Sequence, residues 1–568
     1  MRLHAGLLFS GHDFRLAPGF IEMTVCSITD AAARALQSAL GAAHVEFDAR
    51  CLGRADPYAF SDDAAFAPAA IVRPASTAEI QAVLAIAREH RLPLWTVSTG
   101  KNLGYGGAAP RVGGSVVVDL QRMNRILEVD EELGFAVVEP GVRFLDLYAQ
   151  LRAQGSRLAM SVPDIGWGSL IGNSLERGFG YAANWDHSAT HCGLEIVLAD
   201  GRVVRTGMGA LAASEGGGRS AWHLYKGGLG PSIEGLLLQS NLGIVTRMGV
   251  WLQHRPEVVV ACGVHAARTT DLGALVNTLR PLILDGTIQS NAVIGNATVV
   301  ASMISERARW HSGAGAMPEA SVQAMANALH LGRWNARFGL YGNEAMTTAR
   351  LATVRAAVAR IDGAELVARS YPGDVSAEQA HPADHSQLGI PGLALLRMAD
   401  WRGGEPAHTD FSLVCPATAV DVERQRELIQ RETEAAGFDY AGGFTLCGRH
   451  AIALALIAFD RSDEAMRRSV LPLMRRLINA GAAAGYAPYR SHVALMDHTA
   501  AQYNFNDGAL RHTLQKIKDT LDPAGILSPG KQGVWPSEGA RAAGLQPAHS
   551  GASSTATATA SATATATD

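Results

Sequence analysis

A β-α-β unit followed at once by a glycine-rich loop constrains the fold of this chain more than any other feature of its sequence. Residues 71–72 read as a short strand, and Ser76 with Glu79 forms a capping box at the start of a helix. Apolar residues within 80–87 then recur at i, i+3, i+4 and i+7, which is one face of that helix. Residues 94–97 predict a second strand after the helix. The pattern indicates a domain in which helices cross between strands of one sheet.

The loop after the second strand, S-T-G-K-N-L-G-Y-G-G over 98–107, is a candidate cradle for a phosphate. Its glycines let main-chain N–H groups approach an anion closely, and Lys101 adds a positive charge. No G-K-[ST] closes the segment and it is not G-x-G-x-x-G, so neither an NTPase nor a Rossmann NAD site is supported. The alternative is an ordinary glycine-rich turn.

A second glycine-rich cluster spans 163–181 and indicates backbone that lies against a flat ligand. Asp186, His187 and His191 follow it, and histidines at i and i+4 can share a helix face and bind a metal. No H-E-x-x-H pattern accompanies them, and Gly193 follows closely. We therefore expect no metal site.

Charge and cysteine usage exclude several classes of protein. The chain has 49 Lys+Arg against 53 Asp+Glu, a net charge of −4, and lacks the basic excess of a nucleic-acid binder. Its six cysteines are dispersed, which argues against a disulfide scaffold or a thiolate zinc site. No apolar run reaches the roughly 18 residues of a membrane helix. The first residues make a poor signal peptide, and Met23 is a candidate start of the protein.

Six ordered motifs identify the chain as a member of the vanillyl-alcohol oxidase / 4-cresol dehydrogenase family of flavoproteins, over about residues 71 to 536. The motifs that carry the resemblance are G-K-N-L-G-Y-G-G-A-A-P-R at 100–111, P-D at 163–164, G-N at 172–173 with E-R-G at 176–178, R-T-G-M-G-A-L at 205–211, Q-S-N-L-G-I-V-T at 239–246, and Y-R at 489–490 with S-P-G-K-Q-G at 528–533.

The resemblance implies an α+β fold: a two-lobed FAD-binding domain of the p-cresol methylhydroxylase type (PCMH-type), with an α+β cap or substrate domain over the flavin. We expect an N-terminal extension at 1–60, the FAD-binding domain at 61–253, the cap at 254–489 and a return to the FAD domain at 490–536. The Ala/Thr-rich tail, 537–568, has almost no charge and no large apolar residue, so we expect it to be disordered.

FAD is the cofactor that the resemblance implies. The loop 98–103 would bind its pyrophosphate, and the glycine-rich segments would line the flavin and its ribityl-adenosine arm. The implied cofactor-binding residues are Ser98, Thr99, Gly100, Lys101, Asn102, Leu103, Pro163, Gly168, Ser169, Asn173, Gly180, Tyr181, Gly243, Ile244, Val245, His408 and Lys531. A cation at Lys531 would stabilise the negative charge of the reduced flavin near N1 and O2.

Three residues resemble the substrate clamp of the family. Two phenol donors, Tyr105 and Tyr489, and the guanidinium of Arg490 are suited to a phenolate oxygen. Adjacent strand residues face opposite ways, so Tyr489 and Arg490 converge only if the backbone there is irregular. The alternative is a packed loop tyrosine and a surface arginine. Asp164 occupies the position of a base that activates water at the benzylic carbon of the substrate.

His408 aligns with the histidine that bonds covalently to the flavin 8α-carbon in some members of the family. Other members use a tyrosine or bind the flavin without a bond, and the alternative for His408 is a cap histidine that only packs. The segment around Asp56 and Tyr58 lacks the histidine that assists the attachment in one branch of the family.

The function that the resemblance implies is FAD-dependent oxidation of para-substituted phenols, such as 4-alkylphenols, vanillyl alcohol and eugenol-type compounds. Hydride would pass from the benzylic carbon to flavin N5 and leave a quinone methide, which takes up water or becomes a carbonyl. Oxygen or a c-type cytochrome would accept the electrons. We expect a cytoplasmic homodimer or higher homo-oligomer that binds neither nucleic acid nor membrane. The alternatives are the same fold acting on a non-phenolic alcohol or hydroxy acid, and a non-catalytic flavin-binding protein.

Overall fold

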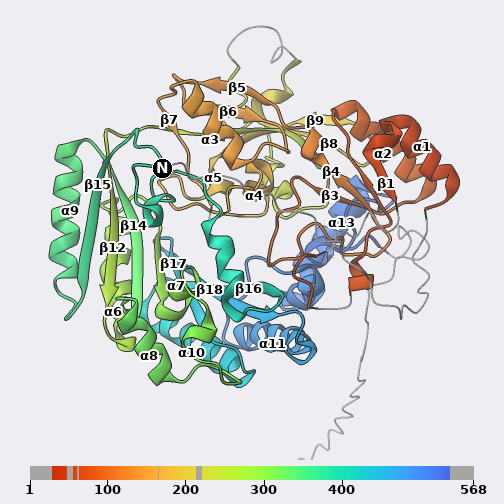
Figure 1. Ribbon diagram of the computed structural model, residues 1–568. Helices are drawn as coiled ribbons and strands as arrows, with labels where there is room; N and C mark the ends of the chain where they lie inside the picture. Colours follow the sequence, from red (N-terminus) through yellow and green to blue (C-terminus); the bar gives the residue numbers. More distant parts are fainter. Residues whose placement is uncertain (1–27, 48–55, 61–62, 164, 213–219, 538–568) are drawn as a thin grey trace, which may run out of the picture.

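The computed structural model describes residues 28–47, 56–60, 63–163, 165–212 and 220–537 (Figure 1). Three large sheets organise these residues, two in the first half of the chain and one in the second. Met23 and the Ala/Thr-rich tail from residue 538 lie outside the described residues, so the predictions about them stay predictions.

The first lobe is built on the predicted β-α-β unit. Ser76 Oγ accepts a hydrogen bond from the backbone N–H of Glu79 at 3.2 Å, and the Glu79 carboxylate accepts one from the N–H of Ala75 at 2.8 Å. The helix then buries the predicted apolar face against the sheet. The sheet order is β1-β2-β4-β3, parallel apart from β1. Its elements are α1 (Asp30–Leu40), β1 (Val45–Phe47), β2 (Ala70–Val72), α2 (Thr77–His90), β3 (Leu94–Val97) and β4 (Val116–Asp119).

The second lobe is an antiparallel sheet of order β5-β6-β10-β8-β9 with its own buried core. Its strands are β5 (Ile126–Asp130), β6 (Phe135–Val138), β8 (His191–Val197), β9 (Val203–Arg205) and β10 (Ile244–Trp251). Its helices are α3 (Phe144–Ala153), α4 (Leu170–Leu175) and α5 (His187–Thr190), and β7 (Leu158–Ala159) pairs with β11 (Gln253–His254) beside them.

The second half of the chain forms one antiparallel sheet of seven strands, in the order β15-β12-β14-β13-β17-β18-β16. The strands are β12 (Val258–Ala266), β13 (Ala292–Asn296), β14 (Trp334–Gly342), β15 (Glu365–Pro372), β16 (Pro406–Pro416), β17 (Ala441–Leu446) and β18 (His450–Asp460). The helices are α6 (Leu272–Leu284), α7 (Ala297–Ser302), α8 (Glu319–Ala328), α9 (Glu344–Val358), α10 (Ala419–Ala435) and α11 (Glu464–Ala483). We call this sheet the cap sheet.

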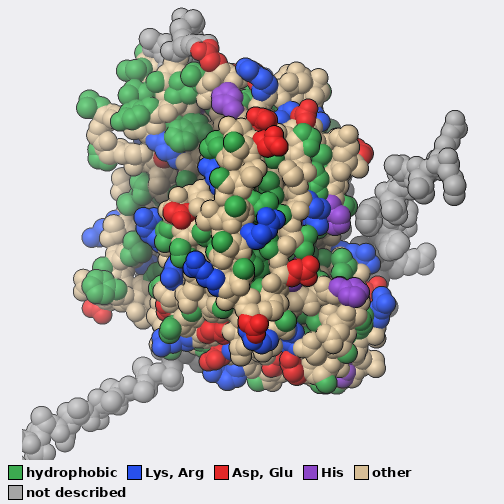
Figure 2. Space-filling model, turned by 90° about the vertical axis from the view of Figure 1, so that its left-hand side faces the viewer, with side chains coloured by type: hydrophobic (Ala, Val, Ile, Leu, Met, Phe, Trp, Pro, Cys, Tyr) green, Lys and Arg blue, Asp and Glu red, His purple; other side chains and the backbone are tan. Residues whose placement is uncertain are grey.

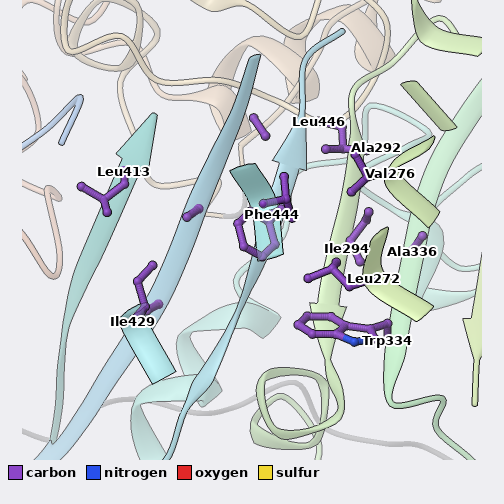
Figure 3. Close-up of a cluster of buried hydrophobic side chains, with 14 of the residues drawn as sticks. Leu272, Val276, Ala292, Ile294, Trp334, Ala336, Leu413, Ile429, Phe444 and Leu446 are labelled. Carbon is purple, nitrogen blue, oxygen red and sulfur yellow. The ribbon is translucent and has the colours of Figure 1, made fainter. Parts of the chain in front are cut away.

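Period-2 alternation gives the cap sheet two different faces. One face packs against α6, α9, α10 and α11 and forms the largest core, in which Ile294, Ala336 and Phe444 lie side by side (Figure 3). The residues between them on the same strands, such as Arg337 and Gly443, face the other way and line a cavity. The sheet thus supplies a core and a cavity wall at once.

The C-terminal segment returns to the first lobe. Backbone N–H groups of Leu94 and Ser528 donate to the carbonyls of Ile526 and Leu94, both at 2.8 Å, so this segment extends the sheet beside β3. Its helices are α12 (Met496–Ala500) and α13 (Phe505–Leu521).

Helix α13 is held in place by a charged side chain. Leu510 is 58% exposed, whereas Lys518 is fully buried. Its Nζ lies 2.7 Å from the Asp522 carboxylate and donates to the carbonyls of Asn241 and Leu527. A buried ion pair therefore orients α13, which hydrophobic periodicity could not predict.

The surface agrees with the near balance of charge in the sequence. Figure 2 shows Lys, Arg, Asp and Glu side chains interspersed over the face it displays. The four described cysteines, Cys192, Cys262, Cys415 and Cys447, are free thiols. Among the described residues, no helix is long and apolar enough to cross a bilayer.

Candidate active site

A cavity of about 890 Å³ lies between the two lobes, the cap sheet and the C-terminal segment. Its wall takes residues 96–103 from the end of β3, 243–245 from the start of β10, and 489–491 and 527–528 from the C-terminal part of the chain. Its volume is near the upper end of the usual range for ligand pockets, roughly 300–1,000 Å³. The cavity therefore has room for a large ligand.

The glycine-rich loop forms the part of the wall that follows β3. Gly104 has a φ of +76°, and a Cβ there would lie 2.6 Å from the Asp410 carboxylate and 3.0 Å from His408 Nε2. Thr409 Oγ1 donates to the carbonyl of Gly104 at 2.8 Å. Only glycine fits this close approach, which holds the loop against strand β16 of the cap sheet.

Tyr105, Tyr489 and Arg490 converge at one end of the cavity. The guanidinium of Arg490 lies over the ring of Tyr105, 4.3 Å from its centroid, and donates a hydrogen bond to the side-chain oxygen of Asn102. Residues 489–490 form a bend and not a strand, so their side chains reach the same place. Gln239 Nε2 donates to the Tyr489 carbonyl at 2.7 Å and fixes the bend.

Burial determines the protonation states of Tyr105, Tyr489 and Arg490. Desolvation raises the pKa of Tyr105 well above 10 and also raises the pKa of Tyr489, although the charge of Arg490 offsets part of each shift. Burial lowers the pKa of Arg490, but the two phenols raise it and the net shift is upward. Both tyrosines therefore keep their protons at neutral pH and can donate them in hydrogen bonds to an anion.

His408 and Asp410 lie on the same face of β16 and line the cavity. His408 Nε2 is 3.5 Å from Asp410 Oδ2, and the ring of Tyr58 lies 4.9 Å from the His408 ring. His408 Nδ1 is buried and makes no hydrogen bond with the described residues. The imidazole thus lies in the cavity wall with one nitrogen beside a carboxylate and one without a protein partner.

Two lysines line other parts of the cavity. Lys531 Nζ lies 2.5 Å from the Glu176 carboxylate, and both side chains are largely buried. Lys101 Nζ lies over the ring of Trp167, 5.3 Å from its centroid. The positive charge of Lys531 is thus balanced by the carboxylate of Glu176, a pairing that the sequence pattern did not indicate.

The structure brings most of the predicted site residues to this one cavity. Those that line it are Ser98, Thr99, Gly100, Lys101, Asn102, Leu103, Tyr105, Pro163, Gly168, Ser169, Asn173, Tyr181, Gly243, Ile244, Val245, His408, Tyr489, Arg490 and Lys531. Gly180 lies outside the wall, where a Cβ would meet Ser161 Oγ at 2.1 Å. Asp164 lies outside the described residues, between Pro163 and Ile165, which both line the cavity.

The residues weighed as a metal site have separate partners. Asp186 caps α5 through the N–H of Ala189, His187 Nδ1 lies 2.6 Å from Asn173 Oδ1, and His191 faces Glu234. No group of three or more metal-ligating side chains occurs among the residues that the structure describes.

Asp410 and Arg337 are among the charged residues of the cavity wall that sequence reasoning missed. The sequence did contain a signal for Asp410, because it follows His408 by two residues in a strand and therefore points to the same face. Arg337 lies on β14, and its place in the wall depends on strand order between segments far apart in the chain. No local pattern carries that information.

The cavity fits FAD. Its glycine-rich loop offers backbone N–H groups that can bind a pyrophosphate. The loop packs closely against helix α4, because a Cβ at Gly172 of that helix would lie 2.4 Å from Ser98 Oγ in the loop. The unpartnered His408 Nδ1 lies in the same wall, at the cap side. Anion-binding backbone and a buried polar atom without a protein partner are both expected where such a cofactor binds.

Comparison with protein families gives two matches. An FAD binding domain matches residues 68–207, and the C-terminal domain of FAD linked oxidases matches residues 334–532. Both segments contribute to the wall of the cavity.

Relatives match over most of the chain. The 4-cresol dehydrogenase [hydroxylating] flavoprotein subunit of Pseudomonas putida is 32% identical over 83% of this chain and 89% of its own length. A 1'-carboxy-chondrochloren decarboxylase of Chondromyces crocatus is 30% identical over 88% of this chain and 97% of its length.

Solved structures agree with these relatives. A 4-ethylphenol oxidase from Gulosibacter chungangensis in complex with isoeugenol has a TM-score of 0.85 and 36% identity, and p-cresol methylhydroxylase with substrate bound has 0.83 and 30%. Each match covers 89% of this chain and 97% of the other. The expected architecture, a two-lobed PCMH-type domain with an α+β cap, is confirmed. The chain therefore belongs to the vanillyl-alcohol oxidase / 4-cresol dehydrogenase family of FAD-linked oxidoreductases, and its cofactor is FAD.

Proposed function

We propose that this protein oxidises para-substituted phenols at the benzylic carbon. The observation that carries the proposal is the convergence of Tyr105, Tyr489 and Arg490 at one end of the cavity. Two protonated phenols and one guanidinium match the lone pairs and the charge of a phenolate oxygen. The names of two relatives, a 4-cresol dehydrogenase and a 4-ethylphenol oxidase, support the same substrate class.

FAD bound in the cavity supplies the two-electron acceptor that takes up a hydride. The protein residues hold the phenol as its anion, whose electrons assist loss of hydride from the benzylic carbon and leave a quinone methide. Asp164, between two residues that line the cavity, takes a proton from the water that adds to this carbon. A 4-alkylphenol then gives a benzylic alcohol, and a 4-hydroxybenzylic alcohol gives a carbonyl compound.

Lys531 and His408 would act toward the cofactor. Lys531 would supply positive charge next to the cofactor, balanced by Glu176. His408, buried in the wall with an unpartnered nitrogen, would form the bond to the flavin 8α-carbon. Acid precipitation tests that bond: flavin should stay with the wild-type protein and not with His408→Ala. Complete release of flavin from the wild type would refute the bond and leave the rest of the proposal standing.

The proposal as a whole is tested by mixing the FAD-loaded protein anaerobically with 4-ethylphenol, eugenol or vanillyl alcohol. We expect loss of the absorbance of oxidised flavin and formation of the hydroxylated or carbonyl product. Repeating the assay with oxygen, with an artificial acceptor and with a c-type cytochrome identifies the electron acceptor. Reduction by a hydroxy acid but by none of the three phenols would refute the proposal.

A further inference from the structure

We propose that Asp410 accepts the Nε2 proton of His408 when the imidazole bonds to the flavin, so that Asp410 is the base of cofactor attachment. This inference rests on the bond between His408 and FAD that the proposed function includes. It starts from the positions of the two residues in strand β16 and from the surroundings of the two imidazole nitrogens.

The strand places Asp410 next to His408 in the cavity wall. The two residues are two positions apart in β16, so their side chains point to the same face of the cap sheet, and both line the cavity. Asp410 Oδ2 lies 3.5 Å from His408 Nε2. A Cβ at Gly104 would lie 2.6 Å from that oxygen and 3.0 Å from that nitrogen, so a glycine in the loop leaves room for both.

The surroundings of the imidazole determine which nitrogen carries its proton. A neutral imidazole has one N–H donor and one nitrogen with a lone pair. His408 Nδ1 is buried without a hydrogen-bond partner among the described residues, so a proton there would be a buried donor without an acceptor. A proton on Nε2 instead faces the Asp410 carboxylate. The neutral side chain therefore carries its proton on Nε2.

The groups on the N-terminal side of His408 do not act as bases. The ring of Tyr58 lies 4.9 Å from the imidazole ring, but burial and neighbouring carboxylates raise the pKa of Tyr58 above 10, so it keeps its proton. Asp56 accepts the N–H of Tyr58 at 3.0 Å and is paired with His492 Nε2 at 2.8 Å. The side chain of Asp410 is 27% exposed, against 9% for His408, so Asp410 can pass a proton on to water.

On the clamp side, Tyr105 and Tyr489 interact electrostatically with Asp410. Burial raises the pKa of both phenols, the negative charge of Asp410 adds to each shift, and the positive charge of Arg490 offsets part of it. Both phenols therefore keep their protons. Around His408 the tyrosines are thus proton donors, and the carboxylate of Asp410 is the acceptor.

Formation of the bond requires the Nε2 proton to leave. A C–H bond of the flavin 8α-methyl group breaks, and a bond forms between the same carbon and a nitrogen of His408. The electron pair of the C–H bond and one proton remain with the flavin, which is thereby reduced, and the electron acceptor of the enzyme then removes two electrons. An imidazole bonded to carbon is neutral only after it has lost the proton it carried, and that proton passes to Asp410.

The test measures the fraction of bound flavin that stays with the protein on acid precipitation. Asparagine keeps the size of Asp410 but does not take up a proton, and a general base contributes about 10²–10⁴-fold to a rate. Purified Asp410→Asn should therefore contain FAD without the bond. Hydroxide replaces the missing base at higher pH, so incubation of this variant between about pH 7 and pH 9 should form the bond about tenfold faster per pH unit. Asp410→Glu should form it at pH 7.

Asp384→Asn is the matched control, because Asp384 is another carboxylate of the cavity wall and is paired with Arg369 at 2.6 Å. This variant should keep the wild-type fraction of covalent flavin. An equal loss of covalent flavin in Asp384→Asn and Asp410→Asn would refute a specific role for Asp410.

Three results for Asp410→Asn would overturn the inference. A wild-type content of covalent flavin would show that no base is needed at this position. Bound FAD that forms no bond at any pH would assign Asp410 a structural role, and loss of FAD would assign it to cofactor binding.

A wild type without covalent flavin would refute the bond and the inference together, whereas oxidation of 4-ethylphenol by that protein would still support the proposed function. A wild type that has the bond but oxidises no phenol would refute the proposed function and leave the role of Asp410 standing.

Discussion

Arg490 supplies the positive charge of the proposed phenol clamp. To hold a phenol as its anion near pH 7, the site must lower a pKa of about 10 by some three units, near 4 kcal/mol at 1.36 kcal/mol per unit. Hydrogen bonds to a charged group contribute roughly 1.5–3 kcal/mol each. We therefore expect Arg490→Ala to lower kcat/KM for 4-ethylphenol on the order of 10²-fold.

For substrates whose phenol is already acidic, the loss of kcat/KM should be smaller, because the site then has to lower the pKa of the phenol by less. Bound substrate should have the red-shifted absorbance of a phenolate in the wild type and should lack it in Arg490→Ala. Equal efficiency of wild type and variant on ordinary and acidic phenols would mean that the clamp is assigned to the wrong residues.

Single residues differ in how much of their role the sequence could predict. The convergence of Tyr489 and Arg490 was predicted on condition of an irregular backbone, and the bend at 489–490 meets that condition. Arg337 and the Lys531–Glu176 pair could not be predicted, since both depend on contacts between distant segments. The roles of the site residues toward FAD and substrate stay predictions.

At the scale of secondary structure, local signals were sufficient for α2 and for the strands β2 and β3. A capping box, a 3.6-residue period and flanking prolines act within one element, so a single sequence contains them. The cap sheet was not predictable in the same way. In this sheet β13 lies between β14 and β17, and β16 lies at an edge. These positions depend on pairings between strands far apart in the sequence, such as that of residues 292–295 with residues 443–446.

Helix α13 depends on one buried ion pair. Removing one partner of such a pair leaves an uncompensated buried charge and typically costs about 3–5 kcal/mol. Lys518→Met should therefore lower the free energy of unfolding by about that amount, since Asp522 would lose its counter-ion while still accepting the N–H groups of Ile526 and Leu527. Lys516→Met, on the exposed side of the same helix, is the control for urea denaturation. Equal midpoints for the two variants would contradict this account of α13.

Two buried histidines, His187 in α5 and His191 at the start of β8, make stability depend on pH. Burial lowers the pKa of His187 and of His191 to about 4, from 6.5. The folded state keeps them neutral, whereas the unfolded chain binds protons below pH 6.5. The free energy of unfolding is therefore unaffected by these groups above pH 6.5 and falls between 6.5 and 4, by up to about 3 kcal/mol for each.

Denaturation at pH 7 and pH 4.5 measures this effect. His191→Gln should lose a smaller fraction of its stability on acidification than the wild type does. His512→Gln, at an exposed position of α13, should keep the wild-type dependence. A pH dependence that is the same in all three proteins would exclude His191 as a cause.

At the scale of the whole molecule, the cavity is where separately packed regions meet. The core of the cap sheet is distinct from the cores of the two lobes. The cavity wall, in contrast, takes residues 98–103 and 243–245 from the lobes, strands from the cap sheet and residues 527–528 from the C-terminal segment. A ligand that fills the cavity contacts all of these regions, so its binding free energy should stabilise them together.

We therefore expect FAD to raise every unfolding transition of His408→Ala, a variant that cannot form the proposed bond to the cofactor. The expected stabilisation follows RT ln(1 + [FAD]/Kd), about 2.7 kcal/mol at 100 times Kd. Scanning calorimetry over a range of FAD concentrations measures it, with AMP as a control that should stabilise less, because it leaves the cap end of the cavity empty. If FAD raised one transition and left another unchanged, the cofactor would contact only one region. The cap would then not close over the flavin, and the predicted division at residue 254 would separate parts that act independently.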